Sequence, residues 1–140
     1  MTIFYFYRII DKKLAMIENK EVVSDADIKK FVNFQFELYK NNLYWVPPIK
    51  KEEAKQLRRT ENPAFDFCDA KFWIAIKDGE VVGRIAAIIN YMYLEKIGKK
   101  KGRISRMEFI DDMDVSEKLL ETAEKFLKEK GMTEVHGPVS

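Results

Sequence analysis

Three aspartates, Asp111, Asp112 and Asp114, crowd a short stretch between a predicted strand and a predicted helix. Carboxylate oxygens of this kind can bind Mg²⁺ or Ca²⁺. They can also cap a helix, and Asp114 with Glu117 has the spacing of a capping box, which predicts Asp114 as the N-cap. Capping accounts for the same residues without a ligand, so no metal site is predicted.

Cys68 and His136 are the only cysteine and the only histidine of the 140 residues. A single imidazole excludes sites that need two histidines from one chain, as most zinc hydrolases do. Cys68 lies between aromatic residues, and apolar surroundings raise a thiol pKa, so it is predicted to be a small core residue and not a nucleophile. One cysteine permits no internal disulfide, which is typical of a cytoplasmic protein.

Basic residues cluster between Lys96 and Arg106, with lysines at 99, 100 and 101 and Arg103 between them. Such a cluster can attract phosphate groups, but it is more often a solvated loop, and the loop is the interpretation we favour. The formal net charge of the chain is only +2, so neither nucleic acid nor a membrane surface is predicted as a partner. No apolar run approaches the roughly 20 residues of a membrane span.

The element that must position these residues is a hairpin over Phe72–Asn90. Asp78-Gly79 separates two runs rich in Ile, Val and aromatic residues, which is the strongest short-range signal for a type I′ turn. The second run is apolar on both faces except for Arg84, so it is predicted to be a central strand covered by helices on each side. Gly83 within it predicts a bulge or a close backbone approach.

The remaining elements follow from apolar periodicity and from capping residues. Trp45, followed by two prolines, predicts a loop that is mostly buried and pinned to the core, or else the wall of a substrate cleft, and we favour the loop. Strand, helix and strand over residues 102–138 predict a parallel pair. The expected elements are a strand at Met16–Val23, helices at 24–40 and 49–60, a connection at 91–101, a strand at Gly102–Ile110, a helix at Val115–Lys130 and a strand from Thr133.

Together these elements predict one α/β (α+β) domain over residues 1–140, with a mixed, mostly antiparallel central sheet and helices on both faces. Residues 1–15 are either an N-terminal extension with a short strand at Thr2–Ile10, or they precede a true start at Met16; the sequence favours neither. The last strand has hardly begun at Ser140. We therefore expect a domain that is incomplete at its C-terminus, completed by a missing C-terminal half or by a second copy in a homodimer.

The element order and four sequence blocks resemble the GNAT superfamily of acyl-CoA-dependent N-acyltransferases. They resemble in particular a bacterial GNAT-like subgroup of largely unassigned function, whose members are longer, so that the likeness covers only their first part. The blocks are Phe36–Pro48, Asn62–Phe65, Val82–Asn90 and Gly131–Pro138.

The resemblance implies transfer of an acyl group from acetyl-CoA or another acyl-CoA to a small-molecule or peptide amine. It implies Glu108 as the base, or alternatively as an exposed strand carboxylate. In that family a glycine-rich turn at a helix start holds the pyrophosphate, whereas here Ile110–Ser116 is acidic and has no glycine, so we expect weak or absent acetyl-CoA binding. The implied cofactor-binding residues are Met107, Phe109, Ile110, Val115 and Ser116. The alternative function is a non-catalytic GNAT-fold binding or scaffold domain, or an inactive fragment.

Overall fold

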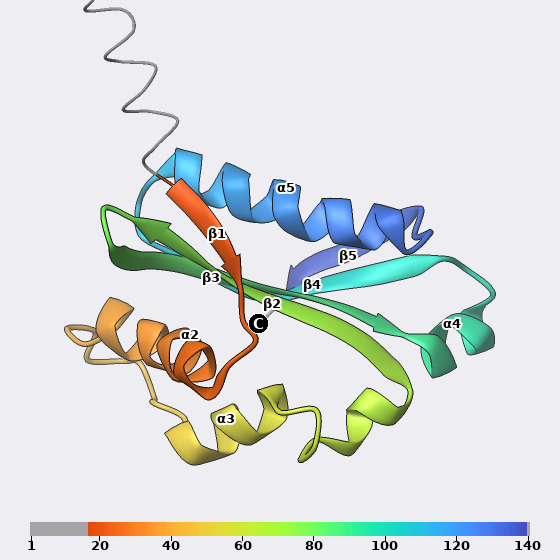
Figure 1. The fold of residues 1–140 in the computed structure, drawn as a ribbon, viewed down its shortest axis with the longest axis horizontal. Coiled ribbons are helices and arrows are strands. Elements are labelled where there is room, and N and C mark those ends of the chain that lie inside the picture. Colours follow the sequence, from red (N-terminus) through yellow and green to blue (C-terminus); the bar gives the residue numbers. More distant parts are fainter. Residues whose placement is uncertain (1–16, 140) are drawn as a thin grey trace, which may run out of the picture.

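A five-stranded sheet with the order β1-β2-β3-β4-β5 forms the centre of the computed structural model, which describes residues 17–139 (Figure 1). The first three pairings are antiparallel and β4 pairs with β5 in parallel. This confirms the predicted mixed, mostly antiparallel sheet. The elements are β1 Ile17–Glu21, α2 Asp25–Leu38, α3 Lys50–Leu57, the 3₁₀ turn η1 Pro63–Asp66, β2 Cys68–Lys77, β3 Glu80–Asn90, α4 Tyr91–Ile97, β4 Lys101–Phe109, α5 Met113–Glu129 and β5 Glu134–Val139.

The predicted hairpin is the β2–β3 pair, and its turn has the expected geometry. Asp78 and Gly79 have φ values of 50° and 80°, so both central residues adopt the left-handed region that a type I′ turn requires. β3 is the third of five strands, which confirms the central strand. Near Gly83 the pairing with β2 shifts by one residue, because Ala75 lies opposite Gly83 but Ile76 lies opposite Val81.

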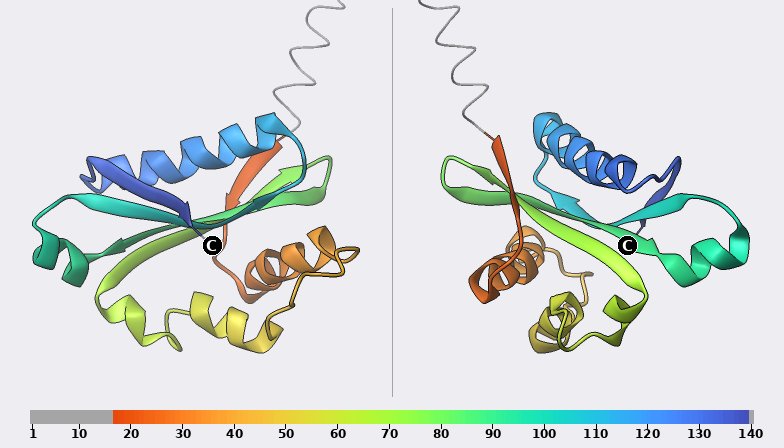
Figure 2. Two further views of the ribbon diagram at one scale, coloured as in Figure 1. Left: turned by 180° about the vertical axis from the view of Figure 1, so that it is seen from behind. Right: turned by 45° about the vertical axis from the view of Figure 1, so that its right-hand side comes forward.

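Helix α5 covers one face of the sheet, and α2 and α3 cover the other, as the two further views confirm (Figure 2). The buried stripe of α5 follows its 3.6-residue period and includes Leu119 and Leu127. Two strand glycines let this helix approach closely. A Cβ on Gly83 would lie 2.9 Å from Leu119 Cδ1, and one on Gly102 would lie 2.6 Å from Leu127 Cδ2. Gly83 therefore has the close approach that its sequence context predicts.

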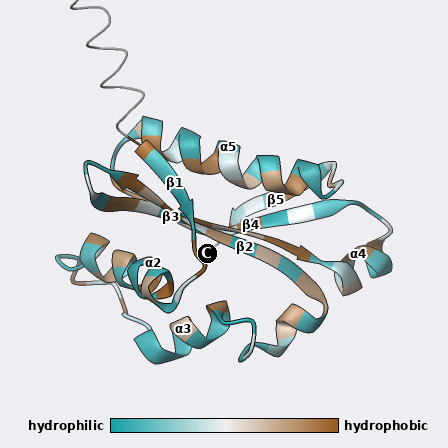
Figure 3. Cartoon of the chain, viewed as in Figure 1, coloured by the Kyte–Doolittle hydropathy of each residue, from teal (hydrophilic) through white to brown (hydrophobic). Residues whose placement is uncertain are grey.

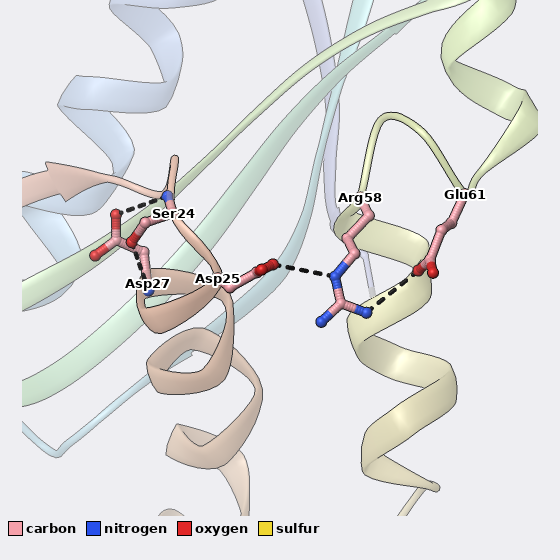
Figure 4. A network of polar contacts seen from close by, with 5 residues as sticks. All are labelled: Ser24, Asp25, Asp27, Arg58 and Glu61. Carbon is pink, nitrogen blue, oxygen red and sulfur yellow. Dashed lines mark hydrogen bonds and ion pairs between the residues drawn. The ribbon is translucent and has the colours of Figure 1, made fainter.

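Helix α2 begins with a capping box in which Ser24 and Asp27 each accept a hydrogen bond from the other's backbone amide (Figure 4). Lys20 of β1 also contacts the Asp27 carboxylate, at 2.9 Å. That contact, with the backbone amides of Val23 and Ser24, holds the pKa of Asp27 far below its usual value. The start of α2 is thus tied to the edge strand.

Arg58, directly after α3, joins the two helices of this face. Its side chain lies between Asp25 at the start of α2 and Glu61, at 3.2 Å from each carboxylate (Figure 4). The distribution of apolar residues agrees with the arrangement of the helices around the sheet. Apolar residues concentrate on β2 and β3, whereas α3 is strongly hydrophilic (Figure 3).

The loop between α2 and α3 is held by one aromatic side chain. Trp45 packs at 5.2 Å from the Phe36 ring and 5.5 Å from the Tyr39 ring, centroid to centroid. It is partly exposed, but most of its surface is covered, as its context predicts. Around it, Leu43 and Tyr44 are 95% and 94% exposed. Trp45 anchors the loop while its neighbours face solvent.

Three local predictions are wrong. Cys68, predicted to be a small core residue, is only partly buried and lies at the start of β2. The expected connection after the hairpin begins with helix α4, which is capped by the Asn90 side chain and ended by Gly98 in the left-handed region. Helix α5 begins at Met113 and its N-cap is Asp112, whose carboxylate accepts from the Asp114 amide at 2.9 Å. Asp114 therefore lies inside the first turn. The expected strand at Thr2–Ile10 and the start at Met16 lie outside the described residues.

Over residues 17–139, the helices are all too short or too polar to span a bilayer.

Candidate functional site

A bulge interrupts β4 where it pairs with Arg84 of β3. Arg84 of β3 lies opposite Glu108, and Ala86 lies opposite Ser105. β4 therefore carries one more residue than β3 in this interval, which is a β-bulge. Arg106, within the bulge, has φ of 50°, a backbone conformation that is uncommon for a residue with a side chain. Bulges re-aim side chains, and this one sets the face on which Glu108 lies.

Glu108 is bound by a residue from helix α2. The Tyr39 hydroxyl, at the C-cap of that helix, donates a hydrogen bond to Glu108 Oε2. This bond, together with desolvation and the carboxylate charge, raises the pKa of Tyr39 to about 12. The phenol therefore remains protonated at neutral pH and acts as a hydrogen-bond donor that orients Glu108.

Arg84 is the one buried charge of the central strand, and it is only 3% exposed. Its guanidinium lies 4.8 Å from the centre of the Phe31 ring and donates to the Phe31 carbonyl at 3.2 Å. Burial lowers the pKa of Arg84 to about 10, and the charge of Glu108 opposes this effect. Among the described residues its Nε has no hydrogen-bond partner. A buried cation with unused donor capacity thus lies beside Glu108.

Arg106 supplies a second cation and links the bulge to helix α3. Its guanidinium donates to Gln56 Oε1 and lies 4.0 Å from Glu53 Oε2. Burial lowers the pKa of Arg106, and Glu53 opposes the shift. Tyr39, Glu53, Arg84, Arg106 and Glu108, which we call the Glu108 cluster, therefore join β3, β4, α2 and α3.

The residues implied as cofactor-binding lie on the other side of the sheet from Glu108. Met107, Phe109 and Ile110 are partly buried against the core under α5. Val115 is fully buried beneath Gly83, and Ser116 is buried with its hydroxyl donating to the Met113 carbonyl at 2.9 Å. The structure thus groups these five residues together and places Glu108 on the opposite face.

The amides at the start of α5 are already engaged. The Asp112 carbonyl and carboxylate accept from the amides of residues 114, 115 and 116. Asp112 is also paired with Lys77 at 2.9 Å, and this contact lowers the pKa of Asp112. Within residues 17–139, no group of three His, Cys, Asp or Glu side chains is arranged to hold a metal ion. A pyrophosphate would meet an occupied, acidic helix end, so the residues present do not fit that group.

Sequence reasoning missed Tyr39 and gave Arg84 no chemical role. Tyr39 was one of several apolar positions on the inner stripe of its helix, so nothing marked its hydroxyl. Arg84 did carry a signal, because a lone charge in an otherwise apolar central strand must find partners when it is buried.

Comparisons with known proteins agree with this architecture. No family model matches the chain. It is 36% identical over 114 residues to Protein YghO of Escherichia coli (strain K12), a match that covers 81% of this chain and 29% of the relative. It is 29% identical over 118 residues to a bacterial ceramide synthase of Caulobacter vibrioides, covering 84% of this chain and 31% of the relative. The chain thus spans less than a third of each of these curated relatives.

Several solved structures with the same arrangement are named as acetyltransferases. A predicted acetyltransferase from Clostridium acetobutylicum, solved with acetyl-CoA, superposes with a TM-score of 0.63 at 19% identity, covering 89% of this chain and 81% of that one. An aminoglycoside acetyltransferase from an uncultured soil metagenomic sample, in complex with sisomicin, gives 0.61 at 14% identity, covering 89% and 78%. The chain therefore has the fold of the GNAT superfamily of acyltransferases.

Proposed function

We propose that this chain contributes to an N-acyltransferase, in which an amine is acylated and Glu108 removes its proton. The observation that carries the proposal is the Glu108 carboxylate at the β4 bulge, oriented by the Tyr39 hydroxyl and facing Arg84. A relative named as a ceramide synthase supports the reaction type, because a ceramide is an amide of a long-chain amino alcohol.

Three residues of this chain have separate roles in the proposed reaction. Glu108 accepts a proton from the amine, so that a nitrogen lone pair becomes available for attack. Tyr39 keeps the carboxylate in one orientation. Arg84 has donor capacity left at Nε, which could stabilise negative charge that develops nearby. The amine nitrogen would form the new C–N bond at the carbonyl carbon of an acyl thioester, the C–S bond would break, and the released thiolate would take up a proton from water. The phosphates of a CoA donor do not fit the occupied start of α5.

The test is an acylation assay on the chain with acetyl-CoA or palmitoyl-CoA as donor and sphinganine as amine, with the amide detected by mass spectrometry. Glu108→Gln should reduce the rate by about 10²–10⁴-fold, the usual contribution of a general base. Glu117→Gln, an exposed carboxylate on α5, is the matched control and should leave the rate unchanged. An equal rate in wild type and Glu108→Gln would refute Glu108 as the base.

The second candidate is a non-catalytic binding domain that keeps the GNAT fold. It is favoured by one specific observation, the engagement of the α5 amides by Asp112. Titration calorimetry with acetyl-CoA tests that observation. Acetyl-CoA binding in the low micromolar range would contradict the non-catalytic candidate and our reading of the α5 turn. Amide formation by the wild-type chain would contradict it independently.

A further inference from the structure

A pocket of about 690 Å³ lies at the end of the sheet that carries α4. It is enclosed by the loop around η1, by α4 and by strands β3, β4 and β5. We call it the Arg103 pocket. Its basic members are Lys101, Arg103, Arg106 and His136. The Glu108 cluster shares one residue with it, Arg106, which lines the pocket and also contacts α3.

Strand alternation explains why these basic side chains share one face. Gly102 and Ile104 point toward α5, since Gly102 lies under Leu127 and Ile104 belongs to the core beneath that helix. Lys101 and Arg103 must therefore point to the opposite face. Arg103 is paired with Ile88 on one side and His136 on the other, so the register itself brings the guanidinium and the imidazole together.

The charge of the pocket is of one sign. Among the described residues that line it, none is Asp or Glu. Over residues 17–139, neither Lys101 nor Arg103 makes a side-chain hydrogen bond or ion pair. The whole chain has a formal net charge of only +2, so this concentration is local. Unpaired cations facing a shared hollow attract anions, and low-dielectric walls strengthen the attraction.

The other side of the pocket is apolar and aromatic. Phe67, Ile88 and Tyr93 line it, and Phe67 and Tyr93 are 37% and 48% exposed. Binding sites for small molecules combine such walls with a few polar groups that fix orientation. We propose that the Arg103 pocket binds a small amphiphilic anion, a phosphate monoester or carboxylate joined to an apolar group. The anionic end contacts Arg103, Lys101 and His136, and the apolar end lies against Phe67 and Tyr93. This site does not depend on acyl transfer.

The only cysteine of the chain provides a reporter inside this pocket. Cys68 lines it, and burial raises the pKa of the thiol while the charge of Arg103 opposes that shift. His136, the only histidine of the chain, gives a single set of imidazole proton resonances. A ligand seated in the Arg103 pocket must therefore slow alkylation of Cys68 and shift the signals of His136 together.

The probes are hexyl phosphate and hexanoate, with hexanol as the neutral analogue, added to the purified chain. Hexyl phosphate or hexanoate should slow the reaction of Cys68 with iodoacetamide by about fivefold or more at saturation and shift the His136 resonances, while hexanol does neither. Arg103→Gln should weaken binding of the anion about tenfold, the usual effect of removing one charge-assisted hydrogen bond. Arg103→Lys keeps the charge and should retain most of the affinity. Lys125→Gln, on α5 across the sheet, is the matched control and should bind as the wild type does.

Arg103 is exposed, so its substitution should leave the fold intact, which circular dichroism checks. The relative affinities of hexyl phosphate and hexanoate identify the preferred anion, and tight binding of either supports the site. Protection by hexanol equal to that by both anions would overturn the proposal, because the pocket would then be merely apolar. Anion binding that is unchanged in Arg103→Gln, or no binding of either anion, would also overturn it and would leave the proposed acyl transfer untouched.

Discussion

Replacing Tyr39 and Glu108 separately and together should reveal a favourable interaction of about 1 kcal/mol between the two side chains. The pKa of Tyr39 rises from 10.0 to about 12, which corresponds to about 2.7 kcal/mol between the two protonation states of the phenol. That figure is an upper limit, because it includes repulsion between tyrosinate and carboxylate. Water also screens a half-buried pair, so less than half of it should remain at neutral pH.

The measurement is a double-mutant cycle with Tyr39→Phe and Glu108→Gln, in which urea unfolding is followed by far-ultraviolet circular dichroism at neutral pH. The matched control pairs Tyr39→Phe with Glu117→Gln, whose carboxylate lies on α5. The free energies of unfolding in the control cycle should be additive to within about 0.3–0.5 kcal/mol. A Tyr39–Glu108 coupling no larger than that would refute the oriented carboxylate, and with it the main support for Glu108 as a base.

The same pair determines a pH dependence with a defined sign. Because the folded-state pKa of Tyr39 is raised, its contribution to stability is fully present below the unfolded pKa of about 10. It is lost as the pH rises from there through about 12. Tyrosinate absorbance at alkaline pH tests this. Up to about pH 10.5, folded wild type and Tyr39→Phe should release the same number of tyrosine protons, and a smaller release by the variant would show that Tyr39 ionises normally.

Three further predictions concern the helix α5 side of the sheet. Gly102→Ala should lower the free energy of unfolding by about 1–3 kcal/mol through overpacking; most of that cost should vanish in a Leu127→Ala background, and an equal cost in both backgrounds would contradict the 2.6 Å approach. Asp112→Ala should destabilise α5 at neutral pH. Because the pKa of Asp112 is lowered in the folded state, its contribution is present above about pH 4 and is lost as the pH falls through the folded pKa, so wild type and variant should converge in acid; an acid-independent difference would contradict the Lys77 contact. Calorimetric titration with acetyl-CoA should show weak or no binding, and low micromolar binding would contradict the occupied α5 amides.

The sequence predicted the features whose causes are local. Asp78-Gly79 favours a type I′ turn between two strands that pair with each other. The apolar stripe of α5 is removed from water when the helix packs on the sheet. These local rules were sufficient for the hairpin, the central strand and the layers.

Other features depend on partners that are distant in the sequence. Asp112 became the N-cap because Lys77, at the end of another strand, holds its carboxylate, whereas spacing alone favoured Asp114. The contact between Tyr39 and Glu108 spans 69 positions. The bulge that sets the face of Glu108 depends on the register of β4 against β3. No residue type in β4 predicts it.

That bulge also determines which residues of β4 are core residues. Before it, the even-numbered Gly102 and Ile104 face α5; after it, the odd-numbered Met107 and Phe109 do. A regular strand would keep one parity throughout. If β4 were regular with the same number of residues, Glu108 would lie opposite Gly83 beneath α5 and two apolar side chains would face Tyr39, whereas deleting one residue at the bulge would make the strand regular and leave Glu108 opposite Arg84.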